Sequence, residues 1–503
     1  MGNHMFDAIR AAAERREAPF IVTQAGRIWT YGDLLDFSAR LAQRLIDLGV
    51  APGDRVAAQV EKSPEALMLY VACLRAGAVY LPLNTGYTLN ELDYFIGDAE
   101  PKLVIVAPKA EAAIASLAKR HGGRVATLDD AGGGSLLAGL DAQHGFTDVE
   151  RGPDDLAAIL YTSGTTGRSK GAMLSHDNLL SNAKTLIAHW QFTAADRLIH
   201  ALPIFHTHGL FVATNVTMLS GASMDFLPRF DPAKIMALMD DATCLMGVPT
   251  FYTRLLQEDG LTREKTANIR LFISGSAPLL ADTHREFAAR TGKAILERYG
   301  MTETNMNTSN PYSGERIAGT VGHPLPGISV RICDPESGAE LATDEIGMIE
   351  VKGPNVFKGY WRMPEKTASE FRADGYFITG DLGKIDAKGY VHIVGRGKDL
   401  VISGGYNVYP KEIESEIDQI AGVVESAVIG VPHPDFGEGV TAIVVRSSDN
   451  AVNEAQIMAA LTKRLARYKQ PKAVHFVPDL PRNTMGKVQK NVLRQIYNDI
   501  YQA

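Results

Sequence analysis

The chain has 503 residues, of which 45% are hydrophobic and 22% are charged, and its formal net charge at pH 7 is −7. These values are ordinary for a soluble globular protein that buries large cores, and the length allows roughly three folding units of about 150 residues each. An acidic balance argues against a protein that binds nucleic acid or a membrane surface. We therefore predict no nucleic-acid partner and no membrane partner.

The cysteines and the start of the chain indicate in which cellular compartment the protein is expected. Cys73, Cys244 and Cys333 are scattered and form no CxxC pair, which predicts neither a disulfide framework nor a zinc site and favours a reducing compartment. No apolar run reaches the roughly 18 residues that a membrane span needs. The first residues carry acidic side chains and lack the apolar segment of a secretory signal. We expect a cytoplasmic protein.

Helical and strand patterns alternate through the first two thirds of the chain. Apolar residues recur at helical spacing over residues 30–49, with Thr30 or Asp33 as possible caps. Residues 55–60 then predict a strand, and residues 63–77 predict another helix, closed by a glycine. The same order of helix and buried strand repeats afterwards. This alternation predicts an α/β fold with largely parallel sheets.

The pattern changes near residue 328, where shorter strands separated by turn residues predict a small β-rich subdomain. A glycine-rich stretch, "GYVHIVGRGKDLVISGGYNVYP", follows at residues 389–410, and helix and strand patterns then alternate again. We predict a large N-terminal domain over residues 1–397 and a small, mobile α+β C-terminal domain over residues 398–503.

A loop rich in glycine and hydroxyl residues lies within "YTSGTTGRSKGAMLSH", residues 161–176. Glycines let the backbone approach an anion closely, and successive amide groups form a concave anion-binding nest. Because Gly167 is followed by arginine rather than lysine, the spacing excludes a Walker A loop. A helix beginning near Ser175 would add further donors. The loop supplies these hydroxyl and cationic side chains: Ser163, Thr165, Thr166, Arg168 and Lys170.

Six segments in order along the chain resemble the motifs of the AMP-forming acyl-CoA synthetases, within the wider adenylate-forming enzymes. In that family a carboxylate attacks the α-phosphate of ATP, pyrophosphate leaves, and a thiol captures the acyl-adenylate. The resemblance therefore implies ATP and CoA as substrates and Mg²⁺ as cofactor. The segments are the loop at 161–176, "SGSAPL" (274–279), "ERYGMTET" (297–304), "GYFITGDLG" (375–383), "GRGKDLVISGGYNVYP" (395–410) and "PRNTMGKVQK" (481–490).

The resemblance also implies a nucleotide site. Tyr299 is expected to pack on adenine, and the carboxylate of Asp381 to accept the ribose hydroxyls. Thr302 is expected to contact the α-phosphate, and Glu303 to hold Mg²⁺, which prefers oxygen ligands. The full set of residues expected to bind ATP is Thr162, Ser163, Gly164, Thr165, Thr166, Gly167, Lys170, Gly275, Ser276, Glu297, Tyr299, Gly300, Met301, Asp381 and Arg396.

Residues near the C-terminus are expected to act in one or the other of the two half-reactions. The resemblance implies that Lys487 bridges the incoming carboxylate and the α-phosphate, a role that suits an ammonium group on a flexible stem. Lys398 occupies the hinge position, about which the small domain would rotate, while Gly404 and Gly405 would let pantetheine pass. Lysine acetylation controls members of this family, so a lysine acetyltransferase or deacetylase acting on Lys487 is a further expected partner.

The segment "LPIFHTHGL" (202–210) and nearby arginines predict the acyl pocket. Buried arginines would be costly beside a fatty acid, whereas a small dicarboxylate could be activated at one carboxylate and pair with arginine through the other. Arg254 is explained nearly as well by a structural ion pair, and Arg298 could pair with Glu297. The pattern most closely resembles the malonate–CoA ligases, which makes malonate the expected substrate and methylmalonate a second candidate. The predicted pocket residues are His206, with a catalytic role, and Thr207, Arg254, Arg298 and Met306.

Three other functions remain open from the sequence. A CoA ligase for another small or aromatic carboxylate is the nearest. An amino-acid adenylation enzyme is a second, although the chain ends at Ala503 with no carrier segment after the lysine motif. A non-catalytic nucleotide-binding protein is the third, and the simultaneous presence of Glu303, Asp381 and Lys487 argues against it.

Overall fold

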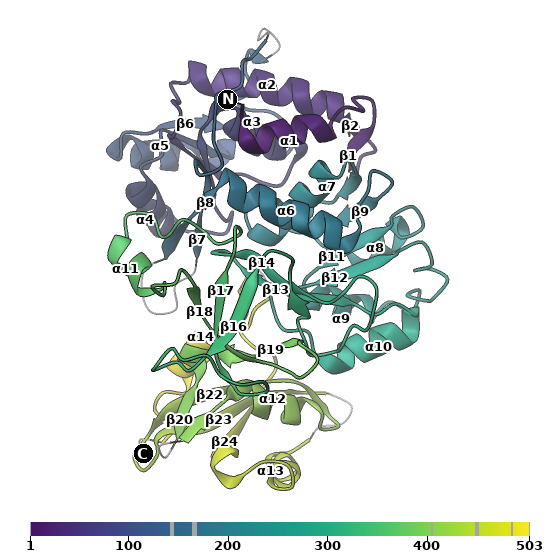
Figure 1. Ribbon diagram of the computed structural model, residues 1–503, viewed down its shortest axis with the longest axis vertical. Coiled ribbons are helices and arrows are strands. Elements are labelled where there is room, and N and C mark those ends of the chain that lie inside the picture. Colours follow the sequence, from purple (N-terminus) through teal and green to yellow (C-terminus); the bar gives the residue numbers. More distant parts are fainter. Residues whose placement is uncertain are drawn as a thin grey trace.

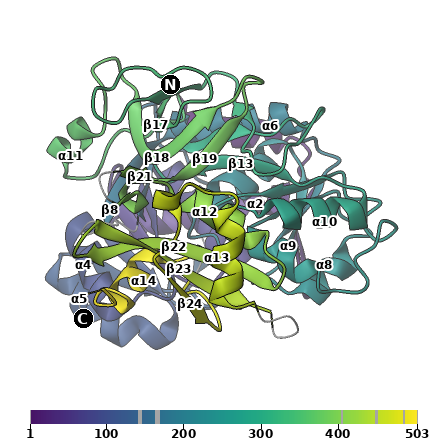
Figure 2. The ribbon, with the colours of Figure 1, turned by 90° about the horizontal axis from the view of Figure 1, so that it is seen from below.

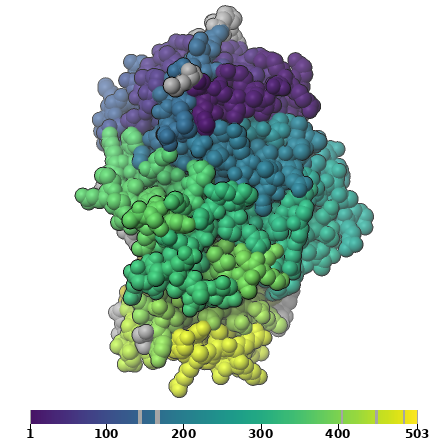
Figure 3. All heavy atoms as spheres, viewed as in Figure 1, coloured from purple at the N-terminus to yellow at the C-terminus, as the bar shows by residue number. Residues whose placement is uncertain are grey.

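The computed structural model describes residues 2–140, 145–162, 169–403, 406–447, 452–483 and 486–501. The chain forms a large N-terminal part and a small C-terminal domain, which lies at the lower end of the molecule in Figure 1. The space-filling view follows the same order, from purple at the top to yellow at the bottom (Figure 3). Within the described ranges, no helix is both long enough and apolar enough to span a membrane.

The first sheet of the large domain has six strands in the order β6-β5-β3-β4-β7-β8. Its pairings are parallel except for the antiparallel hairpin of β7 and β8, which confirms the predicted, largely parallel architecture. The strands are β3 (Arg55–Gln59), β4 (Val79–Pro82), β5 (Leu103–Val106), β6 (Arg124–Thr127), β7 (Leu156–Thr162) and β8 (Lys170–Ser175).

Helices with clear start and stop signals accompany this sheet. Thr30 caps the second helix, and Asp33 completes a reciprocal capping box. The third helix ends at Gly77, which has a φ of 67° that only glycine adopts readily. The predicted boundaries are confirmed. The helices are α1 (His4–Ala12), α2 (Tyr31–Asp47), α3 (Pro64–Ala76), α4 (Leu89–Ala99), the 3₁₀ turn η1 (Pro108–Ala110) and α5 (Glu111–Arg120).

The second sheet has nine strands in the order β15-β14-β13-β12-β11-β9-β10-β1-β2. Its central pairings, from β13 to β1, are parallel, and antiparallel strands close both edges. The carboxyl ends of the parallel strands meet at one edge, where α/β sheets bind ligands. The strands are β1 (Pro19–Thr23), β2 (Ile28–Thr30), β9 (Arg197–His200), β10 (Ser223–Phe226), β11 (Cys244–Gly247), β12 (Leu271–Ser274), β13 (Leu296–Met301), β14 (Asn305–Ser309) and β15 (His323–Pro324).

The segments between these strands are helical. One of them, η3, is a π-helix, a rare form that occurs often at functional sites. The helices are α6 (His176–Trp190), η3 (His208–Thr214), α7 (Asn215–Leu219), α8 (Pro232–Leu238), α9 (Pro249–Leu255) and α10 (Ala281–Thr291).

The predicted β-rich subdomain is a four-stranded antiparallel sheet in the order β16-β17-β18-β19. Its buried side chains join the same hydrophobic core as those of the two larger sheets, so it is part of the large domain. Its elements are β16 (Ser329–Cys333), β17 (Gly347–Lys352), α11 (Pro364–Ser369), β18 (Phe377–Ile385) and β19 (Val391–Arg396).

The C-terminal domain has a sheet of its own, seen from below in Figure 2, and hydrophobic clusters separate from the main core. These features confirm a small α+β domain, while residue 398 as its boundary stays a prediction. Its elements are η4 (Gly397–Asp399), β20 (Val401–Ser403), β21 (Tyr406–Val408), α12 (Pro410–Asp418), β22 (Val423–His433), β23 (Gly437–Arg446), α13 (Glu454–Thr462), η5 (Arg467–Lys469), β24 (Ala473–Val477) and α14 (Lys490–Ile496).

The helix expected near Ser175 is present, because Ser175 caps α6, but its expected contribution of donors to the anion loop is wrong. The glycine-rich loop joins the two strands of the β7–β8 hairpin and does not lead directly into a helix. Helix α6 begins only at His176, after β8, and a six-residue strand spans about 20 Å. The amino end of α6 therefore contributes no donors to an anion held by the loop.

Candidate active site

Arg298 is a buried cation at the carboxyl edge of the nine-stranded sheet. Its side chain projects from β13, and the residue is only 3% exposed. The guanidinium packs directly on Gly275, where an added β-carbon would lie 2.3 Å from Arg298 Cζ. Burial lowers the pKa of Arg298 to about 9, so the group is still charged at neutral pH. Its Nε and Nη2 atoms find no hydrogen-bond partner among the described residues.

Other buried polar groups, on the segments of His206, His208 and Gly275 that lie near Arg298, share this property. In the described part of the chain, the buried Thr207 Oγ1, His208 Nε2 and Ser274 Oγ also lack a hydrogen-bond partner. Burial, followed by the charges of Arg298 and Lys487, lowers the pKa of His206 to about 4, so its imidazole is neutral. Buried polar groups are normally satisfied. Several unsatisfied groups around one cation therefore mark a place where a polar, anionic molecule fits.

Tyr299, Asp381 and Arg396 are brought together from three strands. The Tyr299 hydroxyl donates to Oδ2 of Asp381 at 2.5 Å, and Nε of Arg396 lies 2.7 Å from Oδ1 of the same carboxylate. Asp381 and Arg396 face each other in the register of β18 and β19. All three are predicted nucleotide residues, although they are far apart in sequence.

Lys487 reaches the same place from the C-terminal domain. It follows Gly486, whose added β-carbon would lie 3.3 Å from Thr250 Oγ1 at the start of α9. Burial lowers the pKa of Lys487; the nearby Arg396 lowers it further, and Asp381 opposes both effects. The loop that carries Lys487 therefore rests on the large domain with its ammonium group near the predicted ribose acceptor.

The predicted hinge residue lies in the short 3₁₀ turn η4, directly after β19. Burial lowers the pKa of Lys398 to about 8. The following residue, Asp399, forms an ion pair with Arg494 of α14. The turn is thus connected to the helix that follows the Lys487 loop.

Glu303 and Lys170 are linked through two residues that no motif indicated. Oε1 of Glu303 accepts a hydrogen bond of 3.0 Å from the Tyr360 hydroxyl, and burial raises the pKa of Glu303. Lys170 Nζ lies 3.0 Å from Glu370 and 4.0 Å from the centroid of the Tyr360 ring. Because Lys170 and Glu370 are 200 positions apart, local sequence patterns carry no signal for this contact.

The residues fit a magnesium ion held partly by substrate. Among the residues that the structure describes, no three His, Cys, Asp or Glu side chains come together as a metal cage. Mg²⁺ is commonly held by one or two carboxylates together with substrate phosphates and water. A single buried carboxylate, Glu303, beside Lys170 and the partly buried Thr302 is consistent with that arrangement.

Gly300, Met301 and Met306 belong to the hairpin of β13 and β14. A β-carbon on Gly300 would lie 1.8 Å from the carbonyl oxygen of Asn305 and 2.6 Å from Cε of Met306. Only glycine allows the two strands to approach so closely. Met306 itself is buried.

Two predicted residues are placed differently from the rest. Arg254 is exposed on α9, with its guanidinium 5.9 Å from the ring centroid of Phe230. Glu297 pairs with Nδ1 of the buried His284 at 3.1 Å, on the opposite face of β13 from Arg298, because neighbouring residues of a strand alternate in direction. Pairing of Arg298 with Glu297 is therefore wrong. Because its side chain is paired with His284, Glu297 would have to contact a nucleotide through its backbone. That contact stays a prediction.

The remaining predicted residues flank the site or lie outside the described part of the chain. Thr162 ends β7, and Ser276, with a φ of 72°, places its hydroxyl 3.2 Å from His208 Nδ1. These predicted residues lie outside the described ranges: Ser163, Gly164, Thr165, Thr166, Gly167, Gly404 and Gly405.

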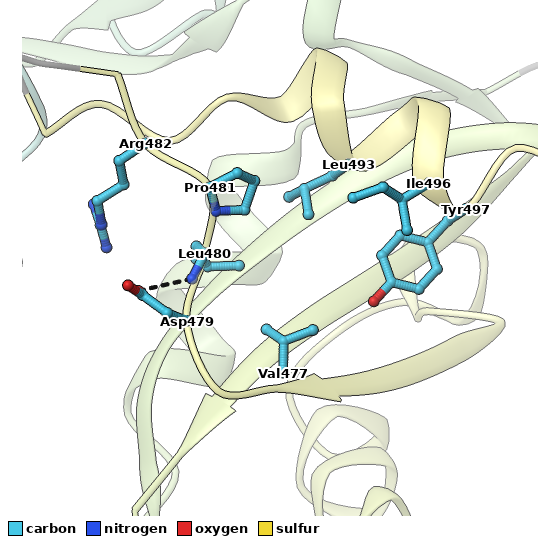
Figure 4. Close-up of a pocket in the computed structure, with 8 residues that line it drawn as sticks. All are labelled: Val477, Asp479, Leu480, Pro481, Arg482, Leu493, Ile496 and Tyr497. Carbon is cyan, nitrogen blue, oxygen red and sulfur yellow. Dashed lines mark hydrogen bonds between the residues drawn. The ribbon is translucent and has the colours of Figure 1, made fainter.

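A surface hollow of about 520 Å³ lies on the C-terminal domain. Figure 4 shows that it opens between the end of β24, the loop that follows it, and α14. None of its lining residues belongs to the predicted nucleotide or acyl sites. They are Val477, Asp479, Leu480, Pro481, Arg482, Leu493, Ile496 and Tyr497.

Comparison with known proteins identifies the family. The pattern of the AMP-binding enzymes matches residues 9–361, and that of the AMP-binding enzyme C-terminal domain matches residues 412–487. The chain belongs to the AMP-binding enzyme family. It is 37% identical to a feruloyl-CoA synthase of Amycolatopsis, over 94% of this chain and 95% of that protein. It is 32% identical to a malonate–CoA ligase of Arabidopsis thaliana, over 93% of this chain and 85% of that protein.

Crystal structures of MatB from Rhodopseudomonas palustris are similar along the whole chain. The sequences are 64% identical, and each chain is covered completely. The TM-score is 0.98 for the ATP-bound form and 0.87 for the apo form. Since the sequence identity is the same, the difference reflects conformation, and this structure resembles the ATP-bound arrangement more closely.

Proposed function

We propose that this chain is an ATP-dependent ligase that joins malonate to CoA. The products are malonyl-CoA, AMP and pyrophosphate, and the intermediate is malonyl-adenylate. Membership of the AMP-binding enzymes and the likeness to a malonate–CoA ligase support the reaction class. The observation that carries the choice of acid is Arg298, a buried cation with two nitrogen atoms that have no partner within the described part of the chain.

Arg298 discriminates between the candidate acids. An unpaired buried charge costs several kcal/mol, and neither the chain of a fatty acid nor the ring of ferulate would relieve that cost. The second carboxylate of malonate does, through charge-assisted hydrogen bonds to a planar guanidinium. Thr207 and Met306 are assigned to the walls around the substrate, where they would set the tolerance for methylmalonate.

The first half-reaction brings an anionic nucleophile onto a polyanion, so charge neutralisation and in-line positioning are the main requirements. We assign Lys487 to the carboxylate and the α-phosphate, and Lys170 to the departing phosphates. Glu303 would hold Mg²⁺, which supplies further neutralisation of the phosphate oxygens. Neutral His206 borders the acid without adding charge.

The second half-reaction needs a thiol in place of the lysine. We propose that the domain of residues 398–503 rotates about Lys398, withdrawing Lys487 and bringing Gly404 and Gly405 to the pantetheine path. Acetylation of Lys487 by a lysine acetyltransferase would remove the charge that adenylation needs. This regulation and a cytoplasmic location remain predictions.

Substrate competition tests the proposal. Purified enzyme is given ATP, CoA and one acid at a time from malonate, methylmalonate, acetate, sulfoacetate, ferulate and palmitate, while pyrophosphate release is followed and the thioester is identified by mass. We expect malonate to have the highest kcat/KM, at least about 100-fold above acetate, because one buried charge pair is worth several kcal/mol. A higher value for ferulate, acetate or sulfoacetate would overturn the choice of malonate, and amino-acid-dependent ATP–pyrophosphate exchange would overturn the reaction class.

A further inference from the structure

The ammonium group of Lys170 is held by a carboxylate and an aromatic ring. Its Nζ lies 3.0 Å from Oε1 of Glu370 and 4.0 Å from the centroid of the Tyr360 ring. The two charged side chains are only 20% and 18% exposed. An ion pair at this depth is less screened by salt than a surface pair. Glu370 is therefore an effective counter-ion of Lys170 within the protein itself.

Glu370 is fixed in place by further contacts. One carboxylate oxygen accepts a hydrogen bond of 2.6 Å from the Tyr360 hydroxyl, and the other lies 2.7 Å from Nζ of Lys366. Burial alone would raise the pKa of Glu370, but the bonds from Lys366, Tyr360 and Lys170 hold it below its ordinary value. The carboxylate is therefore ionised at neutral pH.

Tyr360 fixes the spacing between this pair and Glu303. Its hydroxyl lies 2.6 Å from Oε2 of Glu370 and 3.0 Å from Oε1 of Glu303. The carboxylate that holds Lys170 is thus one hydroxyl away from the carboxylate assigned to the metal. Movement of Lys170 toward a phosphate would have to break or stretch its contact with Glu370.

We infer that Glu370 is a positioning residue that competes with pyrophosphate for Lys170 and so weakens the hold of the enzyme on its leaving group. The inference rests on the proposed function only in taking Lys170 as a phosphate ligand. A lysine with a second anion within reach exchanges between the two, so each lowers the apparent affinity of the other. Glu370 then favours product release after the adenylate has formed.

The test is equilibrium binding of magnesium pyrophosphate to the full-length enzyme, measured by titration calorimetry without acid or CoA. Glu370→Gln keeps the shape of the side chain and removes its charge. We expect pyrophosphate to bind roughly three- to tenfold more tightly, the range that a partly screened ion pair supplies. The matched control is Glu365→Gln, which removes an exposed carboxylate from the same segment and should change binding by less than about 1.5-fold.

A double-mutant cycle separates competition for Lys170 from a general change of charge. In a Lys170→Met background, Glu370→Gln should leave pyrophosphate binding unchanged. Unchanged or weaker binding in the single variant, or the same gain without Lys170, would overturn the inference. If Glu370→Gln does not fold, Glu370→Asp retracts the charge by one methylene and should give a smaller gain in the same direction.

Kinetic measurements distinguish this role from a purely structural one. Glu370→Gln should lower the inhibition constant of pyrophosphate and leave the transfer of a supplied acyl-adenylate to CoA unchanged. Because pyrophosphate binding is measured without any acid, the result is independent of the substrate assigned above. An enzyme that acts on another acid would still show the gain, whereas wild-type protein that binds neither MgATP nor pyrophosphate would refute the proposed function itself.

Discussion

Replacement of Arg298 by methionine is the sharpest test of how the acid is chosen. Methionine fills a similar apolar volume beside Gly275 and removes the guanidinium. Because Arg298 is 3% exposed, no solvent screening reduces the value of its pairing with a substrate carboxylate. Loss of one partner from a buried charge pair costs about 3–5 kcal/mol. At 1.36 kcal/mol for each factor of ten, kcat/KM for malonate should fall by roughly 10²–10⁴-fold.

The assay compares malonate with propionate, in which a methyl group replaces the second carboxylate. Arg298→Met should leave kcat/KM for propionate within about threefold of wild type or raise it, because the variant removes an unpaired buried charge beside the methyl group. Arg254→Met is the matched control. Its side chain is exposed over Phe230, so both acids should keep their wild-type values within about threefold.

Two results would refute the reasoning. Malonate activity that survives Arg298→Met within about threefold would show that no buried charge pair forms there. Equal losses of kcat/KM for malonate and propionate would show that Arg298 supports the fold or nucleotide binding and does not bind the second carboxylate of malonate. ATP affinity, measured separately, should not change.

Three further predictions concern the small domain. Lys487→Ala should lower adenylate formation at least about 100-fold, the usual loss for a group that stabilises developing charge, while CoA transfer from supplied malonyl-adenylate is retained; equal loss of both steps would contradict its role. Lys398→Pro fixes φ at the hinge and should spare adenylation but block thioester formation, so unchanged overall turnover would contradict the hinge. Burial raises the pKa of Asp418 from 3.8 to about 7. The folded protein then holds a proton that the unfolded chain has lost, so stability falls as the pH rises through this window. Asp418→Asn should raise Tm at pH 8 and leave it unchanged near pH 4, and an equal shift at both pH values would contradict burial as the cause.

Local patterns in the sequence were sufficient for the layers of the fold. Capping at Thr30 and Asp33 and the left-handed Gly77 follow from side-chain and backbone preferences that act within one turn. Strand alternation also places Glu297 and Arg298 on opposite faces of β13, which excludes a pairing of their side chains. Such features are encoded over a few residues.

Contacts between distant segments could not be predicted in the same way. Tyr360 meets Glu303 from a position 57 residues later, and Glu370 meets Lys170 from 200 residues later. Neither contact has a local period or a fixed spacing, because the first depends on how the segment after β17 packs against the turn between β13 and β14, and the second on how it packs against β8. The resemblance to a family indicates the predicted nucleotide residues, but it does not indicate Tyr360 or Glu370 as their partners.

The placement of Lys487 has a consequence for the timing of the reaction cycle. Its ammonium group is buried close to Arg396, and both conditions lower its pKa. On the roles proposed above, a cation in that position is held more strongly while the whole triphosphate is near it than when only the α-phosphate of the adenylate remains. We expect loss of pyrophosphate to weaken the hold on the lysine, and excess pyrophosphate to favour the domain arrangement described here in solution scattering. If the small domain rotates as proposed, departure of the first product would itself favour its movement toward the second step.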